Sequence, residues 1–197
     1  MMKKLLRNNK GLSLIELLVA FALLTVVSAA VLGLLTVGAN SFRRVNSEVS
    51  LQYEAQLTMK QLQEYLVDCN RGLFWDSSTR ELFIANADDE NNVTIHRFGL
   101  VDGQIYYSSG EATRSGSTGS CTFGEQNLLS TYTTEFNIFP ASRRDLLGRL
   151  LCESCQVTLS LSMTDRSYKT EELVAMRNPV LLNQANYQSW LNLITAE

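Results

Sequence analysis

The chain has 197 residues, of which 45% are hydrophobic and 19% are charged, and it contains only two prolines. This composition is typical of a globular protein with one ordinary domain and an additional segment, and it excludes collagen-like, rod-like and wholly disordered chains. The formal net charge of −3 provides no basic surface of the kind that binds nucleic acid, so no nucleic-acid partner is predicted.

The charges are divided unevenly along the chain. Four basic residues and no acidic residue precede Gly11, so the rest of the chain holds 13 of the 17 basic residues against 20 acidic ones, a net charge of −7. These four residues are Lys3, Lys4, Arg7 and Lys10. A basic start followed by an acidic body is typical of a targeting segment and an exported part, and we expect residues 1–11 to be a basic leader peptide.

A long apolar segment follows the leader. Residues 17–42 are 26 residues without a charge or a proline, and as a helix they would span about 39 Å, enough to cross a bilayer core. We therefore expect residues 12–42 to form a transmembrane helix. The larger basic cluster lies on the N-terminal side of the span and only Arg43 and Arg44 follow it, so the positive-inside rule places the N-terminus in the cytoplasm.

One acidic residue, Glu16, interrupts the apolar stretch that begins at Leu12. A carboxylate near hydrocarbon costs roughly 2.5–3.5 kcal/mol on insertion scales, and such a group normally has a partner. Removal of the leader would create an α-amine at Leu12, and this amine on a neighbouring subunit is a suitable partner for Glu16. The pattern therefore suggests that cleavage is coupled to assembly.

Residues 10–19, KGLSLIELLV, resemble the prepilin cleavage signal of type IV pilins and pseudopilins. The shared features are a short basic leader, a glycine at the cut, an apolar residue after it, a glutamate five residues past the glycine and a long apolar helix. The resemblance is close over the leader and the apolar segment and extends to the remainder only in outline.

In that family a membrane-embedded aspartyl peptidase, the prepilin peptidase, cuts after the glycine and methylates the new amine. The resemblance implies that Gly11 is the cleavage residue, Leu12 the methylated terminus and Glu16 the assembly carboxylate. Leu12 stands where phenylalanine is usual, and Gly33, with Gly38 beyond it, takes the place of a helix proline found in many major pilins. Each glycine weakens a helix by about 1 kcal/mol relative to alanine, and we hypothesise that this stretch bends or melts during packing.

Beyond the span the pattern becomes amphipathic, and residues 43–70 are expected to extend the same helix. An apolar stripe, which we interpret as the face packed against the chain's own domain, comprises Val45, Val49, Tyr53 and Leu57, with Leu62, Leu66 and Cys69 continuing it approximately. Asn70-Arg71-Gly72 favours termination of the helix.

Residues 71–178 carry strand signals and predict a β-rich globular domain. The expected strands are 81–86, 93–98, 104–108, 131–139, 156–163 and 168–176, with a hairpin at Asp102-Gly103 and strand ends at Pro140 and Pro179. A long helix followed by antiparallel strands predicts an α+β, pilin-like fold in which the sheet buries its apolar face on the outer half of the helix.

Residues 179–197 form a C-terminal tail, with a short helix docked on the sheet as one alternative. For Trp75 and Trp190, packing within the domain is favoured over a role as interface anchors. Residues 108–120, rich in glycine, serine and threonine, are interpreted as a flexible surface loop.

The four cysteines, Cys69, Cys121, Cys152 and Cys155, favour disulfides over free thiols or a zinc site in an exported chain. Three complete pairings stay open. If residues 152–156 are extended, Cys152 and Cys155 face opposite sides of the sheet and pair with Cys69 and Cys121; if they form a turn, a local bridge is the alternative.

No nucleophile system can be built around His96, the only histidine. We therefore predict no catalytic residue, no metal site, no cofactor and no enzymatic activity.

The sequence predicts a structural subunit, a minor pilin or pseudopilin of a type IV pilus, a type II secretion filament or a competence filament. Its expected partners are the prepilin peptidase, other pilin subunits and the cytoplasmic membrane, which it spans once before it joins a surface or extracellular filament. Two alternatives remain open. One is a filament-tip adhesin or DNA receptor that uses residues 108–120, and the other is a secreted or anchored protein with an ordinary signal sequence cut before Asn40.

Overall fold

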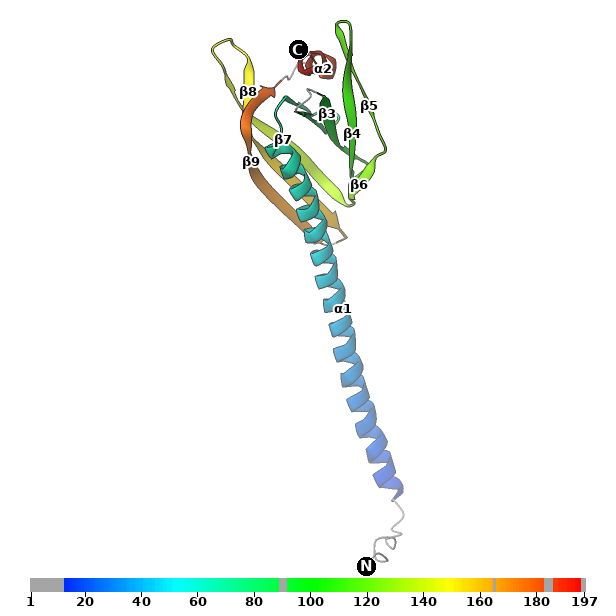
Figure 1. The fold of residues 1–197 in the computed structure, drawn as a ribbon. Coiled ribbons are helices and arrows are strands. Elements are labelled where there is room, and N and C mark those ends of the chain that lie inside the picture. Colours follow the sequence, from blue (N-terminus) through cyan, green and yellow to red (C-terminus); the bar gives the residue numbers. More distant parts are fainter. Residues whose placement is uncertain (1–12, 89–91, 165, 183–185, 196–197) are drawn as a thin grey trace, which may run out of the picture. The chain divides into compact units, whose positions relative to one another are not determined.

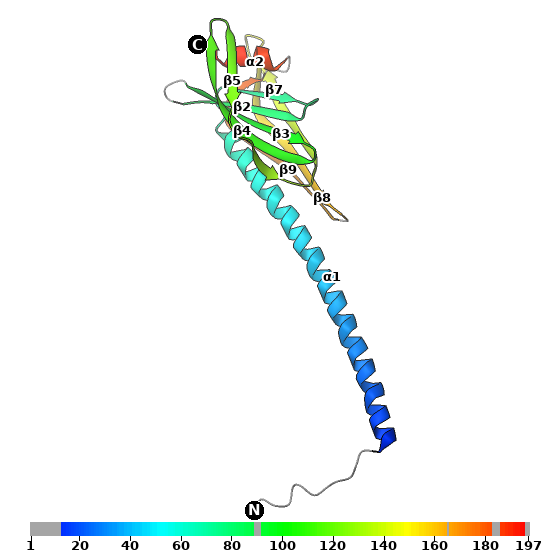
Figure 2. The ribbon, with the colours of Figure 1, turned by 90° about the vertical axis from the view of Figure 1, so that its right-hand side faces the viewer.

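The computed structural model describes residues 13–88, 92–164, 166–182 and 186–195. The chain divides into two compact units, Met1–Asn46 and Ser47–Glu197, and the boundary between them falls inside the first helix. Within the described ranges the elements, seen in Figures 1 and 2, are α1 (Leu14–Val67), β1 (Gly72–Asp76), β2 (Glu81–Ala87), β3 (Val93–Val101), β4 (Gln104–Ser115), β5 (Thr118–Phe123), β6 (Asn127–Ser130), β7 (Thr133–Arg144), β8 (Leu150–Met163), β9 (Arg166–Leu182) and α2 (Tyr187–Ile194).

The strands form one curled sheet in the order β5-β4-β3-β2-β1-β9-β8-β7, with β6 paired to β4 (Figure 1). Every neighbouring pair is antiparallel except β1 and β9, which run parallel over a short register at Gly72 and Leu73. The protein thus has the predicted α+β, pilin-like architecture: one long N-terminal helix and a largely antiparallel sheet.

In the second unit a hydrophobic core lies on each face of the sheet. Alternate residues of a strand point to opposite faces, so a single strand contributes to both cores. On β2, Leu82 and Ile84 join the core under α1, whereas Phe83 and Ala85 join a second core under α2. Helix α2, which contacts β5 and β1 (Figures 1 and 2), buries Trp190, Leu191 and Ile194 in this second core.

The docking of α2 explains the glycine at the start of β1. A Cβ atom on Gly72 would lie 2.8 Å from Cγ2 of Ile194, which is closer than a real contact allows. The Arg71 guanidinium Nε donates a hydrogen bond of 3.1 Å to the carbonyl oxygen of Ile194. The alternative of a short C-terminal helix docked on the sheet is therefore confirmed, and Trp190 packs in the interior, as favoured, rather than at a surface.

The helix face that packs against the sheet differs from the predicted one. Helix α1 buries Leu51, Ala55, Thr58, Met59, Leu62 and Leu66 against the sheet. The predicted stripe is correct at its C-terminal end, where Leu62, Leu66 and Cys69 are buried. It is wrong for the four residues before them, since Val45, Val49, Tyr53 and Leu57 are all exposed in the single chain. Two apolar stripes exist on this helix, and sequence periodicity alone could not tell which one meets the sheet.

The hairpin predicted at residues 101–104 is confirmed. Asp102 and Gly103 have φ of 51° and 75°, so both central residues adopt the left-handed conformation that a type I′ turn requires. The six predicted strands are also present, although several are longer than expected.

The strands extend beyond their predicted ends for identifiable reasons. β7 continues past Pro140 because it is the edge strand of the sheet, where a missing N–H group is tolerated. β9 continues to Leu182, with residues 176–179 bulging out before the pairing resumes at Val180. Residues 108–120 lie in the β4–β5 hairpin, so the interpretation as a flexible loop was wrong.

Replacement of Leu62 by alanine tests which face of α1 is packed. Leu62 is 0% exposed, and truncation of a buried leucine lowers the free energy of unfolding by about 2–5 kcal/mol. The matched control is Leu57→Ala on the same helix, where the side chain is 48% exposed and a change within about 0.5 kcal/mol is expected. Urea unfolding of the full chain in detergent measures both, and equal effects would contradict the assignment of the faces.

Candidate functional site

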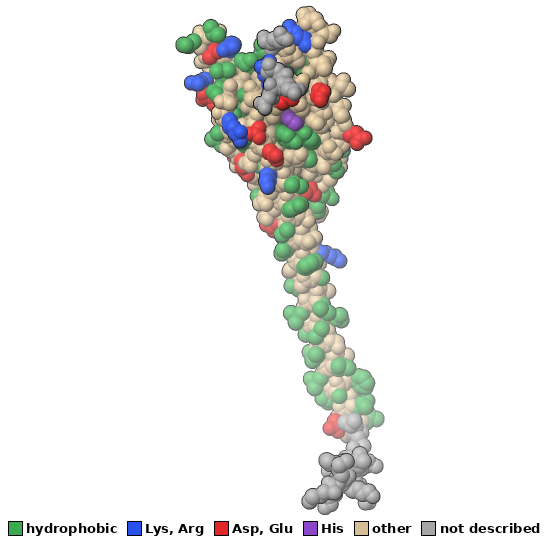
Figure 3. All heavy atoms as spheres, viewed as in Figure 1, with side chains coloured by type: hydrophobic (Ala, Val, Ile, Leu, Met, Phe, Trp, Pro, Cys, Tyr) green, Lys and Arg blue, Asp and Glu red, His purple; other side chains and the backbone are tan. Residues whose placement is uncertain are grey.

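The first unit consists of an apolar helix whose surface no other described residue covers. Every large apolar side chain of α1 from Leu14 to Phe42 is at least 49% exposed, and this part of the helix is long and apolar enough to cross a membrane. Figure 3 shows hydrophobic side chains along the visible face of the helix. An apolar surface of this extent requires a bilayer or other apolar helices around it.

Few polar groups interrupt this segment, and its two threonines form hydrogen bonds within the helix. The hydroxyls of Thr25 and Thr36 donate to the carbonyl oxygens of Ala22 and Gly33 at 2.7 and 2.8 Å. The helix is continuous through Gly33 and Gly38, and nothing lies within 4 Å of a Cβ atom placed on either. The predicted bending at this stretch stays a hypothesis.

Glu16 lies in the first turn of α1 and is exposed. Ser13 directly precedes the helix, and its carbonyl oxygen accepts the N–H of Leu17 at 3.1 Å. A carboxylate in the first turn is favoured by the unpaired N–H groups and the helix dipole. No residue in the part of the chain that the structure describes forms an ion pair with Glu16.

The two residues of the predicted cut, Gly11 and Leu12, lie outside the described residues. Their roles therefore stay predictions. The structure does describe Glu16, which lies near the predicted cut. Its side chain extends from a helix that begins at Leu14 and is accessible to a cation from another molecule.

His96 is part of an aromatic stack and not of a catalytic system. Its ring lies 4.0 Å from the ring of Tyr65 on α1, and Nδ1 is 2.9 Å from the Tyr107 hydroxyl, which in turn donates to the Tyr65 hydroxyl at 3.1 Å. Burial lowers the pKa of His96 from 6.5 to about 4 and raises the pKa of Tyr107 to about 12, so both of these groups are neutral near pH 7. The stack joins the helix to β3 and β4.

This stack predicts a loss of stability in acid. A base whose pKa is lower in the folded chain binds fewer protons when folded, so its contribution is present above pH 6.5 and is lost as the pH falls towards about 4. His96→Phe keeps the stacking on Tyr65 and removes the titration. We expect the free energy of unfolding to fall more steeply between these pH values in the wild type than in this variant. Parallel slopes in urea titrations across this range would contradict the prediction.

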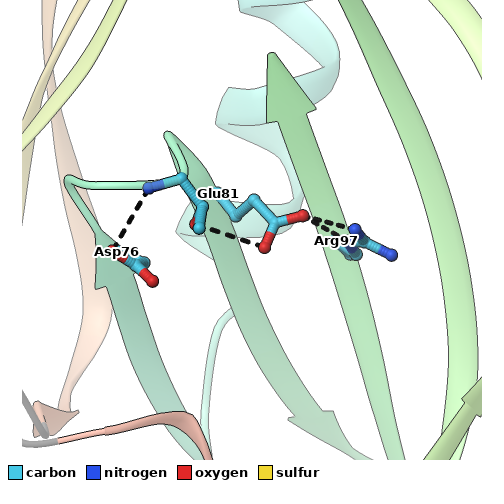
Figure 4. Close-up of polar contacts among 4 residues, drawn as sticks. Asp76, Glu81 and Arg97 are labelled. Atoms are coloured by element: carbon cyan, nitrogen blue, oxygen red, sulfur yellow. Dashed lines mark hydrogen bonds and ion pairs between the residues drawn. The ribbon is translucent and has the colours of Figure 1, made fainter. Parts of the chain in front are cut away.

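A second polar cluster lies on β2 and β3 and in the turn before β2, and its charged groups bond to one another or to a nearby hydroxyl. The Glu81 carboxylate accepts the Arg97 Nε–H at 3.0 Å (Figure 4). The guanidinium carbon of Arg97 lies 5.5 Å from the centre of the Phe123 ring. In the adjoining turn, hydrogen bonds from Ser78 to the Asp76 carboxylate lower its pKa. The cluster pairs each charge with a partner and presents no activated nucleophile.

The cysteines are brought together differently from the prediction. Cys69, Cys152 and Cys155 share the core under α1, whereas Cys121 lies on β5 beside the core under α2. All four are thiols in this structure. The expectation that Cys152 and Cys155 face opposite sides of an extended strand does not hold, because both side chains are buried in the same core.

Residues 6–38 match the family described as the prokaryotic N-terminal methylation motif. The chain therefore carries a type IV pilin-like prepilin signal, the class of processing signal that the sequence resemblance indicated. No curated protein and no solved structure matches the chain.

The match covers residues 6–11 of the leader and most of the apolar segment. A signal of this kind is typical of prepilin-type substrates of the pilin and pseudopilin class, whose members are structural subunits. The signal implies processing by a prepilin peptidase and assembly with other subunits, and together with the apolar helix it indicates membrane anchoring before assembly.

Proposed function

We propose that the protein is a minor pilin or pseudopilin, a structural subunit of a type IV pilus, a type II secretion filament or a competence filament. The observation that carries this proposal is the prepilin signal at residues 6–38 joined to an apolar helix that no described residue covers. Prepilin peptidase cuts after Gly11 and methylates Leu12, and the subunit then packs through residues 12–69.

Glu16 directs the assembly step in this proposal. Before cleavage Glu16 follows the basic leader in the sequence, five residues after Gly11, and cleavage removes that leader. In a filament core without water, an unpaired carboxylate is costly, and a neighbouring α-amine removes this cost by forming a charge-assisted hydrogen bond. The same contact sets the position of each subunit relative to the next.

The exposed stripe of α1 extends the packing surface beyond the membrane segment. The side chains of Val49, Tyr53 and Leu57 are 48–65% exposed although they lie on the same helical segment as the buried stripe. An exposed apolar row with helical spacing is the kind of surface that packs against a second helix. We assign this row to neighbouring subunits of the filament.

The continuity of the helix supports a cut at the leader. An ordinary signal sequence would be cut before Asn40, but α1 runs without interruption through residues 37–40. In this proposal the leader alone is removed, and before assembly the N-terminus lies in the cytoplasm with the remainder outside, as the basic residues before Gly11 favour.

The mass of the mature protein tests the processing step. We expect a chain that begins at Leu12 and carries one methyl group on its α-amine, because the peptidase performs both reactions. Intact-mass analysis of the protein purified from its native membrane provides the measurement. A chain that retains the basic leader, or one that begins at Asn40, would overturn the proposal.

Replacement of Glu16 by glutamine tests the assembly step. The side chain keeps its size and loses its charge, so we expect normal cleavage and membrane insertion with loss of incorporation into filaments. Glu48→Gln, a change at an exposed glutamate of the same helix, is the matched control and should assemble normally. Immunoblots of sheared filaments against whole membranes distinguish the two, and normal incorporation of the Glu16 variant would sink the proposal.

The exposed stripe gives a separate prediction. The double variant Val49→Ser, Tyr53→Ser should change the free energy of unfolding by no more than about 0.5 kcal/mol per site, because both side chains are exposed. It should nevertheless reduce filament incorporation, since the apolar contact with a neighbour is lost. Gln56→Ser, at an exposed polar position, serves as the control. Full incorporation of the double variant would exclude this stripe from the interface.

A further inference from the structure

The core under α1 contains a pair of cysteines that the backbone brings into direct contact. Cys152 and Cys155 are each 0% exposed, and their Sγ atoms are 3.5 Å apart. Three residues of regular strand would instead direct the two side chains to opposite faces. The contact therefore depends on an irregularity in β8.

That irregularity is a β-bulge at Glu153. On the edge strand, Ala141 pairs with Ser154 and Ser142 pairs with Cys152, so Glu153 has no opposite residue. The extra residue shifts the alternation by one and turns Cys152 to the same side as Cys155. On the other side, β9 bulges as well, since Ala175 pairs with Ser154 and the pairing resumes only at Val180.

The other two cysteines have different surroundings. The Cys69 thiol donates to the carbonyl oxygens of Gly72 and Ala85 at 3.4 and 3.6 Å, so it is directed at the backbone. Burial raises the pKa of Cys69 to about 12, which keeps it a neutral thiol. In the folded chain it is therefore not directed at another sulfur atom.

Cys121 is separated from the other cysteines by the sheet itself. It pairs with Ala112 on β4, which pairs with Val93 on β3, which pairs with Ala87 on β2, the strand that Cys69 contacts. Three strand spacings amount to about 14 Å, whereas the Cα atoms of a disulfide are roughly 4.4–6.8 Å apart. Cys121 also faces the α2 side of the sheet, so a bridge to Cys69 is excluded.

We propose that Cys152 and Cys155 close to an intrachain disulfide across the β8 bulge and that Cys69 and Cys121 remain thiols. The oxidant is an external disulfide, such as that of a thiol–disulfide oxidoreductase or oxidised glutathione. In the cell the proposal rests on the proposed function, because export of the domain supplies the oxidising compartment. The geometry itself does not depend on export.

In the folded chain the hydrogen bond between the two sulfur atoms lowers the pKa of Cys152 and raises that of Cys155. Before folding neither thiol has this contact, so either of them can attack first. In one of these two equivalent orders the nucleophile is Cys152. Its thiolate attacks one sulfur of the oxidant, forms a mixed disulfide and releases the other sulfur as a thiolate. Cys155 then loses its proton, and its thiolate attacks the Cys152 sulfur, which forms the intrachain disulfide and displaces the oxidant sulfur that was bound there. The chain loses two hydrogens and the oxidant leaves as two thiols. Both cysteines are buried in the folded chain, so the exchange takes place before β8 and β9 close over α1.

Peptide mapping tests the pairing directly, because one tryptic fragment contains both cysteines. Trypsin cuts after Arg149 and Arg166, and the fragment 150–166 holds Cys152 and Cys155, whereas Cys69 and Cys121 lie in two other fragments. The full chain is alkylated under denaturing conditions and digested without reduction. We expect fragment 150–166 to be unalkylated and two hydrogens lighter than its reduced form, with Cys69 and Cys121 alkylated.

Two preparations separate this proposal from the proposed function. One is the chain purified from native membranes, and the other is the reduced, unfolded full chain refolded in detergent with glutathione buffer. A bridge in both supports the proposal. A bridge after refolding but four thiols in native membranes contradicts the exported location and hence the proposed function. A bridge that involves Cys69 or Cys121, or four thiols in both preparations, overturns the pairing.

Variants provide an independent measurement. Reduction should lower the midpoint of thermal unfolding of the oxidised wild type by a few degrees, because the bridge fixes the bulge. Cys69→Ser keeps the pair and should show the same shift, whereas Cys152→Ser should show none. If reductant shifts the Cys152→Ser midpoint as it does the wild type, or leaves the wild-type midpoint unchanged, the proposal fails.

Discussion

Helix α1 has two apolar surfaces that must be kept from water, and the rest of the structure depends on what covers each of them. Along its second half α1 buries Leu51, Leu62 and Leu66 in the core of the sheet. Along its first half the same helix buries nothing in the described part of the chain. The domain can therefore fold around the C-terminal half of the helix, whereas the N-terminal half requires a bilayer or further helices to cover it. This arrangement is expected of a membrane subunit that later assembles.

In the proposed assembly, the carboxylate of Glu16 determines how neighbouring helices are positioned against one another. Apolar packing alone sets no unique position of one helix against another, because a smooth apolar surface can slide. A single charge in that surface is tolerated only where a partner meets it, so it selects one arrangement among many. Removal of the leader and creation of the partner amine are the same event in the proposed mechanism, which is why processing would precede assembly.

The second unit is held by contacts between residues distant in sequence. His96 stacks on Tyr65 of the helix, and α2 closes the opposite face of the sheet with Trp190. The β8 bulge is a local feature with a larger consequence: the one additional residue, Glu153, brings Cys152 and Cys155 into contact. These features explain why the chain keeps an irregular sheet: its irregularities place side chains in the core.

The amino-acid sequence by itself determined what depends on local order along the chain. Local patterns predicted four features: the leader, the apolar span, the unusual position of Glu16 and the Asp102-Gly103 hairpin. Each of these depends on residues that are close together in the sequence. Most of the strands were found for the same reason. Only the tertiary structure decided which stripe of α1 meets the sheet, where β7 and β9 end, how α2 docks and which cysteines touch. Those outcomes depend on competition among distant partners, and a periodic pattern records that a face is apolar without recording what covers it.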